Sequence, residues 1–155
     1  LIRIAATALI AFYPVVKGIM SEHGDAVRVV IRYTPFHGEA SEEAIQVLET
    51  ARMQGVFEQV LEAVLRDQPL WASHGAPEPG LILQIAAGAG LDAEAAQTQM
   101  RAPDIVGILN QDRADVEAVG VSQTPTFFVN GKPLSPFGEA ELRALVAEEV
   151  AAAKS

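Results

Sequence analysis

The sequence contains no cysteine among its 155 residues. A disulfide, a thiolate nucleophile and a thiolate metal site are therefore excluded for the chain as written. The absence does not identify a redox compartment, because a protein without cysteine is compatible with either side of a membrane.

Basic residues are also scarce. The chain has 11 Lys and Arg against 20 Asp and Glu, which gives a formal net charge of −9. Nucleic acids and anionic membrane surfaces select basic patches, so we expect no nucleic-acid partner. The longest apolar stretches, residues 1–12 and 80–90, are well short of the about 20 residues that a membrane helix requires, so we expect no membrane insertion of this chain.

Aromatic residues make up 6% of a chain in which 50% of the residues are hydrophobic. The core should therefore consist mainly of Ala, Val, Leu and Ile, which favours a helix-rich protein. The length fits one domain that can bury most of its apolar surface. The segment 1–11 lacks the basic leader of a signal peptide and runs into a helical pattern, so we expect it to be part of the fold.

The first third of the chain has the pattern of a strand, a helix and a strand. Apolar residues recur at helical spacing over residues 10–23, and Pro14 falls in the first turns of that segment, where a missing N–H matters least. The β-branched run at residues 27–33 is typical of a strand that is covered on both faces in a parallel sheet. Residues 1–4 would then be the remnant of a first strand.

The segment from about residue 41 to residue 118 is expected to be entirely helical. Ser41 is a candidate N-cap, with Glu42 and Glu43 in the first turn of its helix. Asp92 is the candidate cap of a second, shorter helix, and Pro103 starts a last helix that ends before Gly120. Trp71 and Phe57 are expected to pack this helical region rather than to stack on a cofactor.

The last third begins with a proline at the entrance of a strand. Pro125 precedes the β-branched and aromatic residues 126–129, and a proline is tolerated at a strand start because it removes a ladder donor. Asn130-Gly131 then predicts a type I′ hairpin, in which both central residues need positive φ. A helix with one apolar face follows from about Phe137.

This order of elements, with Gly120-Val121 followed by Thr124-Pro125-Thr126-Phe127-Phe128-Val129-Asn130-Gly131, resembles the DsbA-like thiol-disulfide oxidoreductases. The resemblance implies an α/β thioredoxin fold, a central mixed β-sheet flanked by helices with an all-helical insertion. Residues 1–36 and 119–155 would form the thioredoxin core of a single domain and residues 37–118 the insertion. It also implies a cis bond before Pro125, for which a trans proline that opens an edge strand is the alternative.

In that family a Cys-x-x-Cys motif lies between the first strand and the first helix, whose N-terminus stabilises the thiolate. Counting back from Pro14 places the two catalytic positions at Ala6 and Leu9, neither of which can exchange thiols. Three explanations are open: the cysteines were substituted, the protein is a natural redox-inert relative, or residues 1–10 are misassigned or replaced. We favour the third, because residues 1–10 lack every family feature while the match becomes good abruptly at Ala11.

The resemblance further implies that Thr124 and Pro125 bind an extended protein or peptide substrate by strand addition. It implies a periplasmic or cell-envelope location and no cofactor. No metal site is expected, because His23, His37 and His74 lack ligand spacing. The alternative function is a non-catalytic peptide-binding or chaperone-like module on the same scaffold.

Overall fold

The structure is a computed structural model that describes residues 2–7, 12–34, 39–72, 78, 80–121 and 125–154, with the backbone alone for residues 2–7. It divides into two compact units. One comprises Leu1–Arg32 and Val119–Ser155, and we call it the sheet unit. The other, Tyr33–Ala118, is the helical unit.

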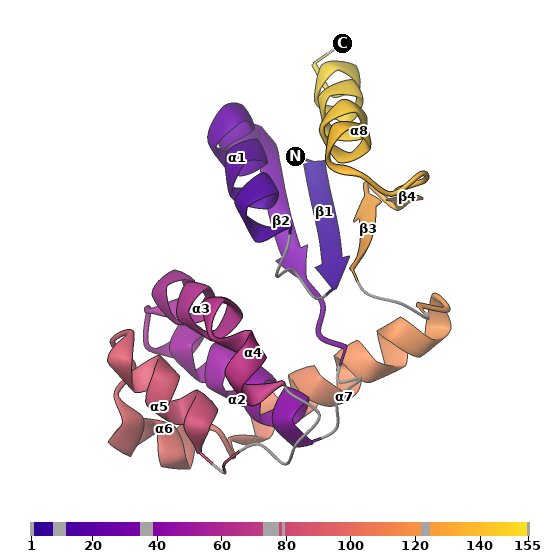
Figure 1. The fold of residues 1–155 in the computed structure, drawn as a ribbon. Helices are drawn as coiled ribbons and strands as arrows, with labels where there is room; N and C mark the ends of the chain where they lie inside the picture. Colours follow the sequence, from indigo (N-terminus) through magenta and orange to yellow (C-terminus); the bar gives the residue numbers. More distant parts are fainter. Residues whose placement is uncertain are drawn as a thin grey trace. The chain divides into compact units, whose positions relative to one another are not determined.

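The described part of the sheet unit contains a four-stranded sheet in the order β2-β1-β3-β4 (Figure 1). Strand β1 (Ile2–Thr7) runs parallel to β2 (Val27–Ile31) and antiparallel to β3 (Thr126–Val129). Strand β4 (Lys132–Pro133) pairs antiparallel with β3. The sheet is therefore mixed, as predicted, and the strand-helix-strand opening forms its parallel pair.

The turn between β3 and β4 has the backbone conformation that Asn130-Gly131 predicts. Asn130 has φ 50° and Gly131 has φ 81°. Val129 pairs with Lys132 across the turn. The predicted tight hairpin is confirmed, because the two residue types that most readily adopt positive φ occupy its two central positions.

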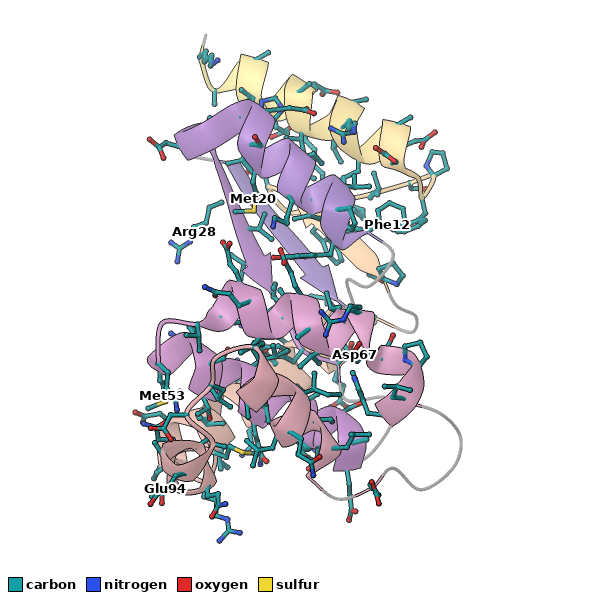
Figure 2. All side chains as sticks on the ribbon, turned by 60° about the vertical axis from the view of Figure 1, so that its left-hand side comes forward. Phe12, Met20, Arg28, Met53, Asp67 and Glu94 are labelled. Atoms are coloured by element: carbon teal, nitrogen blue, oxygen red, sulfur yellow. The ribbon has the colours of Figure 1, made fainter. Side chains whose placement is uncertain are left out.

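The core of the sheet unit lies against one face of the sheet. Alternate strand residues on that face pack against helices α1 (Tyr13–His23) and α8 (Glu139–Ala152). The buried members of this core are Val16, Ile19, Val27, Phe127, Val129, Leu142, Val146 and Val150. Arg28, the neighbour of Val27, points to the other face and extends away from the ribbon in Figure 2. A 3₁₀ turn at Gly24–Ala26 joins α1 to β2.

Six helices make up the described part of the helical unit. Their bounds are α2 (Glu39–Met53), α3 (Phe57–Arg66), α4 (Gln68–Trp71), α5 (Leu81–Gly88), α6 (Ala93–Gln99) and α7 (Pro103–Ala118). Helix α2 is the centre of the unit, since it contacts α3, α5, α6 and α7. Trp71 is buried and its Nε1 donates a hydrogen bond to the carbonyl of Val64 at 2.9 Å, so it packs this unit as predicted.

Two carboxylates cap helices in the helical unit. Asp92 Oδ1 accepts hydrogen bonds from the N–H groups of Glu94 and Ala95 at 3.1 and 3.0 Å, which confirms the predicted N-cap of α6. Helix α5 has Gly80 at its N-cap, and the carboxylate of Glu43 on α2 bonds the backbone of Gly80 and Leu83 instead. Burial raises the pKa of Glu43, an effect that these two backbone hydrogen bonds partly offset.

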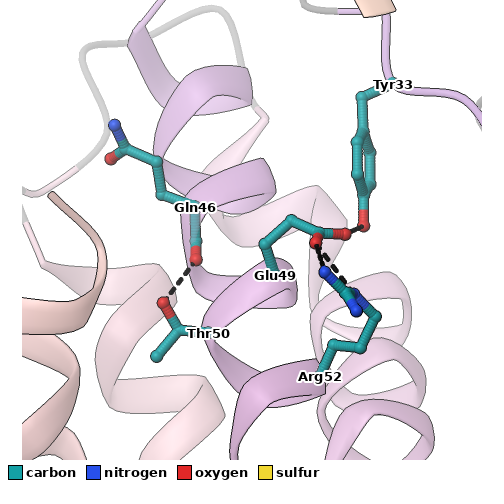
Figure 3. A network of polar contacts seen from close by, with 5 residues as sticks. All are labelled: Tyr33, Gln46, Glu49, Thr50 and Arg52. Atoms are coloured by element: carbon teal, nitrogen blue, oxygen red, sulfur yellow. Dashed lines mark hydrogen bonds and ion pairs between the residues drawn. The ribbon is translucent and has the colours of Figure 1, made fainter. Parts of the chain in front are cut away.

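Polar side chains occupy the interior of the helical unit beside Tyr33 (Figure 3). The Tyr33 hydroxyl donates to Glu49 Oε1 at 2.8 Å, and Arg52 donates to Glu49 Oε2 through Nε at 2.9 Å and Nη2 at 2.6 Å. The Tyr33 N–H donates to Asp112 Oδ2 at 3.0 Å. Burial, together with the charges of Glu49 and Asp112, raises the pKa of Tyr33 far above its usual range.

Some predicted element bounds were wrong. Helix α1 begins at Tyr13 rather than at residue 10, and β1 extends to Thr7 rather than ending near residue 4. Strand β1 is longer than predicted because its backbone pairs with both β2 and β3 as far as Ala6, and with β3 as far as Thr7. Ser41 is not an N-cap, because α2 already begins at Glu39 and buries Ser41 within the helix.

No helix in the described ranges is long and apolar enough to cross a membrane.

Candidate functional site

The N-terminus of α1 is the first part of the candidate site. In the family that the sequence resembles, the reactive cysteine lies at this end of the first helix. Phe12 is the N-cap residue and provides no side-chain hydrogen bond, and Pro14 occupies the first turn. The first turn also contains no acidic residue. The positive end of the helix dipole is therefore not neutralised by a local carboxylate, an environment that favours an anion such as a thiolate.

The sheet register brings the end of β1 to the start of β3. Ala6 pairs with Phe127, and Thr7 pairs with Thr126, the residue that directly follows Pro125. Position 6 is thus paired with the residue that lies two positions after Pro125 in the chain. Leu9 and Thr124 lie outside the described residues, as does the Thr124–Pro125 bond.

Ala6 itself lies inside β1 and not between strand and helix, where counting back from Pro14 had placed it. The physical reason is the composition of the segment as written, since Ile2 to Thr7 is a run without glycine or proline that completes two ladders. A Cys-x-x-Cys loop at positions 6–9 would require the strand to end earlier.

Three aromatic rings meet beside this site. The ring centroid of Phe12 lies 5.6 Å from that of Phe127 and 4.6 Å from that of Phe137, and Phe127 and Phe137 are 6.0 Å apart. Phe127 is 1% exposed, whereas Phe137 is 49% exposed. Figure 2 shows Phe12 at the start of α1. We call Phe12, Phe127 and Phe137 the aromatic cluster; it offers an apolar surface at which a side chain of a bound peptide could be buried.

Sequence reasoning missed this cluster. Phe12 fell within residues 10–23, which were predicted to form a helix, and Phe137 only marked the approximate start of the last helix. The signal that was available is that both residues stand at helix entrances: Phe12 is the N-cap of α1, and Phe137 directly precedes Gly138, the N-cap of α8. The spacing of 125 residues between them gives no hint that the rings touch.

Ligands for a metal ion are not gathered anywhere in the described ranges, where no group of three or more His, Asp or Glu side chains is arranged to hold one. His23 lies at the end of α1, while His37 and His74 fall outside the described residues. With no cysteine in the sequence, the chain as written has no group that could exchange thiols.

Comparisons with known proteins identify the family. The family model described as thioredoxin matches residues 11–148. A thioredoxin-like oxidoreductase from Silicibacter pomeroyi is similar over 99% of this chain and 87% of its own, with 27% identity and a TM-score of 0.70. BdbD from Bacillus subtilis is similar over 97% and 88%, with 18% identity and a TM-score of 0.80.

DsbA from Pseudomonas aeruginosa is similar over 99% of this chain and 86% of its own, with 24% identity and a TM-score of 0.75. A Na⁺/H⁺ antiporter, NhaA of Herminiimonas arsenicoxydans, is 32% identical over 117 residues, which are 75% of this chain but only 18% of that relative. The chain therefore belongs to the thioredoxin family and has the fold of its DsbA-like members, a thioredoxin fold with a helical insertion, without their Cys-x-x-Cys motif.

Proposed function

We propose that this chain is a DsbA-like thiol-disulfide oxidoreductase whose cysteine pair belongs at positions 6 and 9, and that residues 1–10 as written are misassigned or replaced. As written, the chain is redox-inert, because it has no thiol. The proposal thus separates the function of the family from the capacity of this particular sequence.

One observation carries the proposal. The family match covers residues 11–148, so it begins immediately after the segment that would hold the cysteines. Substitution of two cysteines would have left their neighbours recognisable, whereas a replaced segment ends the match at a sharp boundary. The first turn of α1, which contains no acidic residue, supports the same proposal, because it would stabilise a thiolate placed before it.

The chemistry that the pair would perform is thiol-disulfide exchange between its dithiol and a disulfide of a client protein. The thiolate of the first cysteine attacks one sulfur of a client disulfide, and the other client sulfur leaves as a thiolate. The second cysteine then attacks the mixed disulfide, which leaves the client reduced and the pair oxidised. The reverse sequence oxidises a client dithiol.

The test is to sequence the coding DNA on both sides of the codon for Ala11 in the source genome and to measure the intact mass and titratable thiols of the protein purified from it. The expected result is a Cys-x-x-Cys motif ahead of Ala11 and two titratable thiols in the reduced protein. The proposal would be overturned if the DNA and the mass both agree with the written sequence and no thiol is found. The explanations left would then be that the cysteines were substituted or that the protein is a natural redox-inert relative. The same DNA also shows whether the domain is joined to a transporter, since the antiporter relative is much longer than this chain.

Location belongs to the same proposal. Protein disulfides persist in oxidising compartments, so an oxidase of this type would act in the periplasm or elsewhere in the cell envelope. Fractionation of source cells, with detection by an antibody against residues 11–155, tests it; recovery in the cytoplasm alone would contradict it.

The second candidate is a non-catalytic peptide-binding module, which the exposure of Phe137 in the aromatic cluster supports. Here the backbone at Thr124 and Pro125 would pair with an extended peptide, and the cluster would bury one of its side chains. Phe137→Ser should weaken binding of an unfolded, disulfide-free polypeptide, whereas Leu70→Ser, at an exposed apolar residue of the helical unit, should not. An equal effect of the two substitutions argues against this candidate.

A further inference from the structure

The hairpin turn between β3 and β4 contains one of the two asparagines in the sequence, Asn110 and Asn130. Asn130 is exposed and is followed by Gly131, whose missing side chain leaves its backbone nitrogen unshielded. Asn110 is also exposed, but it lies within α7 and is followed by Gln111. Asparagine amides are thermolabile because the next backbone nitrogen can attack them, so the two positions differ in reactivity although both are open to solvent.

One carboxylate of α8 holds both sides of this turn. Glu149 Oε2 accepts a hydrogen bond from Nδ2 of Asn130 at 2.8 Å, and Glu149 Oε1 lies 2.5 Å from Nζ of Lys132. The Glu149 side chain is only 11% exposed, whereas that of Lys132 is 56% exposed. Hydrogen bonds from Lys132 and Asn130 hold the pKa of Glu149 below its usual range, so this carboxylate stays ionised at neutral and alkaline pH. The turn is thus fastened to α8 at both ends.

The conformation of the turn keeps the two reacting atoms apart. Attack of the Gly131 nitrogen on Cγ of Asn130 closes a five-membered ring, which requires this nitrogen and Cβ of Asn130 to lie on the same side of the Cα–C bond. The φ values of 50° and 81° are those of a type I′ turn, in which ψ at the first central residue is about +30°. That ψ places the two atoms on opposite sides of the bond. The ring therefore forms only when the turn opens.

We propose that Asn130 is a site of spontaneous deamidation and that the contacts of Glu149 with the turn set its rate. When the turn opens, the Gly131 nitrogen bonds to Cγ of Asn130 and the Cγ–Nδ2 bond breaks. The amide nitrogen leaves as ammonia with the proton that the Gly131 nitrogen loses. Water then adds to one carbonyl of the resulting succinimide, and the ring opens to aspartate or isoaspartate. No oxidant, cofactor or thiol takes part, so this inference stands whether or not the proposed function does.

The products change the hairpin in two ways. A carboxylate at position 130 repels Glu149, to which the amide donates in the unmodified protein. Isoaspartate also adds one methylene group to the backbone of the turn. The longer turn weakens the pairing of β3 with β4, including the hydrogen bond from the Leu134 N–H to the Phe127 carbonyl, which is 2.9 Å long. Deamidation therefore loosens β4 from the sheet.

The test incubates the folded protein at pH 8 and follows both asparagines by mass spectrometry after digestion. Cleavage by trypsin at arginine gives peptides 102–113 and 114–143, which contain Asn110 and Asn130 respectively. Methylation by an isoaspartyl methyltransferase identifies the isoaspartate product. Asn130 should convert, but more slowly than in a free peptide of residues 126–135, and Asn110 should stay unchanged.

Glu149→Ala should raise the rate of conversion at Asn130 by about fivefold, because it removes the ionised acceptor that holds the amide. Glu148→Ala is the matched control. It removes the same charge from the neighbouring position of α8, and Glu148 lies 3.8 Å from Lys132, so it should leave the rate nearly unaltered. Val146→Ala, in the buried core of the sheet unit, controls for lowered stability and should not raise the rate either.

Three results would each overturn the proposal. They are an unchanged Asn130 in the Glu149→Ala protein, an equal acceleration by Glu148→Ala, and conversion of the natural protein as fast as the free peptide. An equal acceleration by Val146→Ala would show that unfolding of the whole sheet unit sets the rate, rather than the contacts of Glu149, and it would also overturn the proposal.

Discussion

Arg143 of α8 passes directly over Gly18 of α1: a Cβ atom at position 18 would lie 3.0 Å from Nη2 of Arg143. From this position Nη1 of Arg143 reaches Glu22 Oε1 at 2.7 Å, and Nε reaches Glu139 Oε1 at 3.0 Å. The missing side chain at position 18 leaves the room that Arg143 needs to join the two helices that cover the sheet.

Gly18→Ala should therefore stabilise the protein less than the same change does at an ordinary helical position. Alanine is favoured over glycine in a helix interior by about 1 kcal/mol, but the new methyl group displaces Arg143 from Glu22. The full gain should return in the Arg143→Ala background. Urea unfolding of the four proteins, analysed as a double-mutant cycle, measures this coupling, and equal gains in both backgrounds would show that the two residues do not interact.

Gly131→Ala should destabilise the protein by about 1–2 kcal/mol, because φ at this position is 81° and a side chain is strained there. Gly107→Ala is the matched control. Gly107 lies within α7 and an added Cβ would meet nothing within 4 Å, so that substitution should stabilise the protein by about 1 kcal/mol. Opposite signs in thermal or urea unfolding are the expected result; the same sign for both would contradict it.

Tyr33→Phe should destabilise the helical unit by about 1–2 kcal/mol at neutral pH, because it removes the donor to the buried carboxylate of Glu49. It should also change the alkaline pH dependence. The pKa of Tyr33 is raised in the folded state, so the unfolded chain releases this proton first and stability falls as the pH rises above the ordinary value of 10.0.

The measurement is urea unfolding between pH 7 and 11, with absorbance at 295 nm to follow tyrosinate formation. The difference between the natural protein and Tyr33→Phe should shrink as the pH rises above 10. A difference that stays constant across this range would show that Tyr33 ionises alike in both states.

Glu43→Gln should change how the free energy of unfolding depends on pH in the acidic range. Burial raises the pKa of Glu43, so the folded state holds this proton at a pH where the unfolded chain has released it. The contribution of Glu43 to stability is therefore largest at a pH below the ordinary value of 4.5 and declines as the pH rises through the raised folded pKa.

Relative to the natural protein, Glu43→Gln should be less favourable at pH 4 than at pH 7. Urea unfolding at the two values checks this. Glu94→Gln, at an exposed residue in the first turn of α6, is the control for removal of a carboxylate. If Glu43→Gln is instead less favourable at pH 7 than at pH 4, the pKa of Glu43 is not raised in the folded state.

Features that depend on a few neighbouring residues could be predicted from the sequence. Asn130-Gly131 predicted the turn correctly, and Asp92 predicted the helix cap correctly. Both depend on backbone conformations and hydrogen bonds between residues that are close neighbours in the chain. Ser41 failed as a cap although it is the same kind of residue. Whether a helix begins at Ser41 or two residues earlier depends on how α2 packs against its neighbours, which local sequence does not contain.

The candidate site was predictable only in part. Proline before an aromatic strand predicted where β3 begins, whereas the pairing of Ala6 with Phe127 follows from the ladder between β1 and β3. The aromatic cluster was not predictable, since Phe12, Phe127 and Phe137 come from three separate segments.

The sequence by itself determined the order of strands and helices, the hairpin and the absence of a thiol in the chain as written, because periodicity, turn residues and residue type are local properties. Tertiary structure alone decided where β1 ends, which carboxylate caps α5 and which aromatic rings meet at the start of α1. Those outcomes depend on contacts between residues that are distant along the chain, and such contacts form only when the elements pack together.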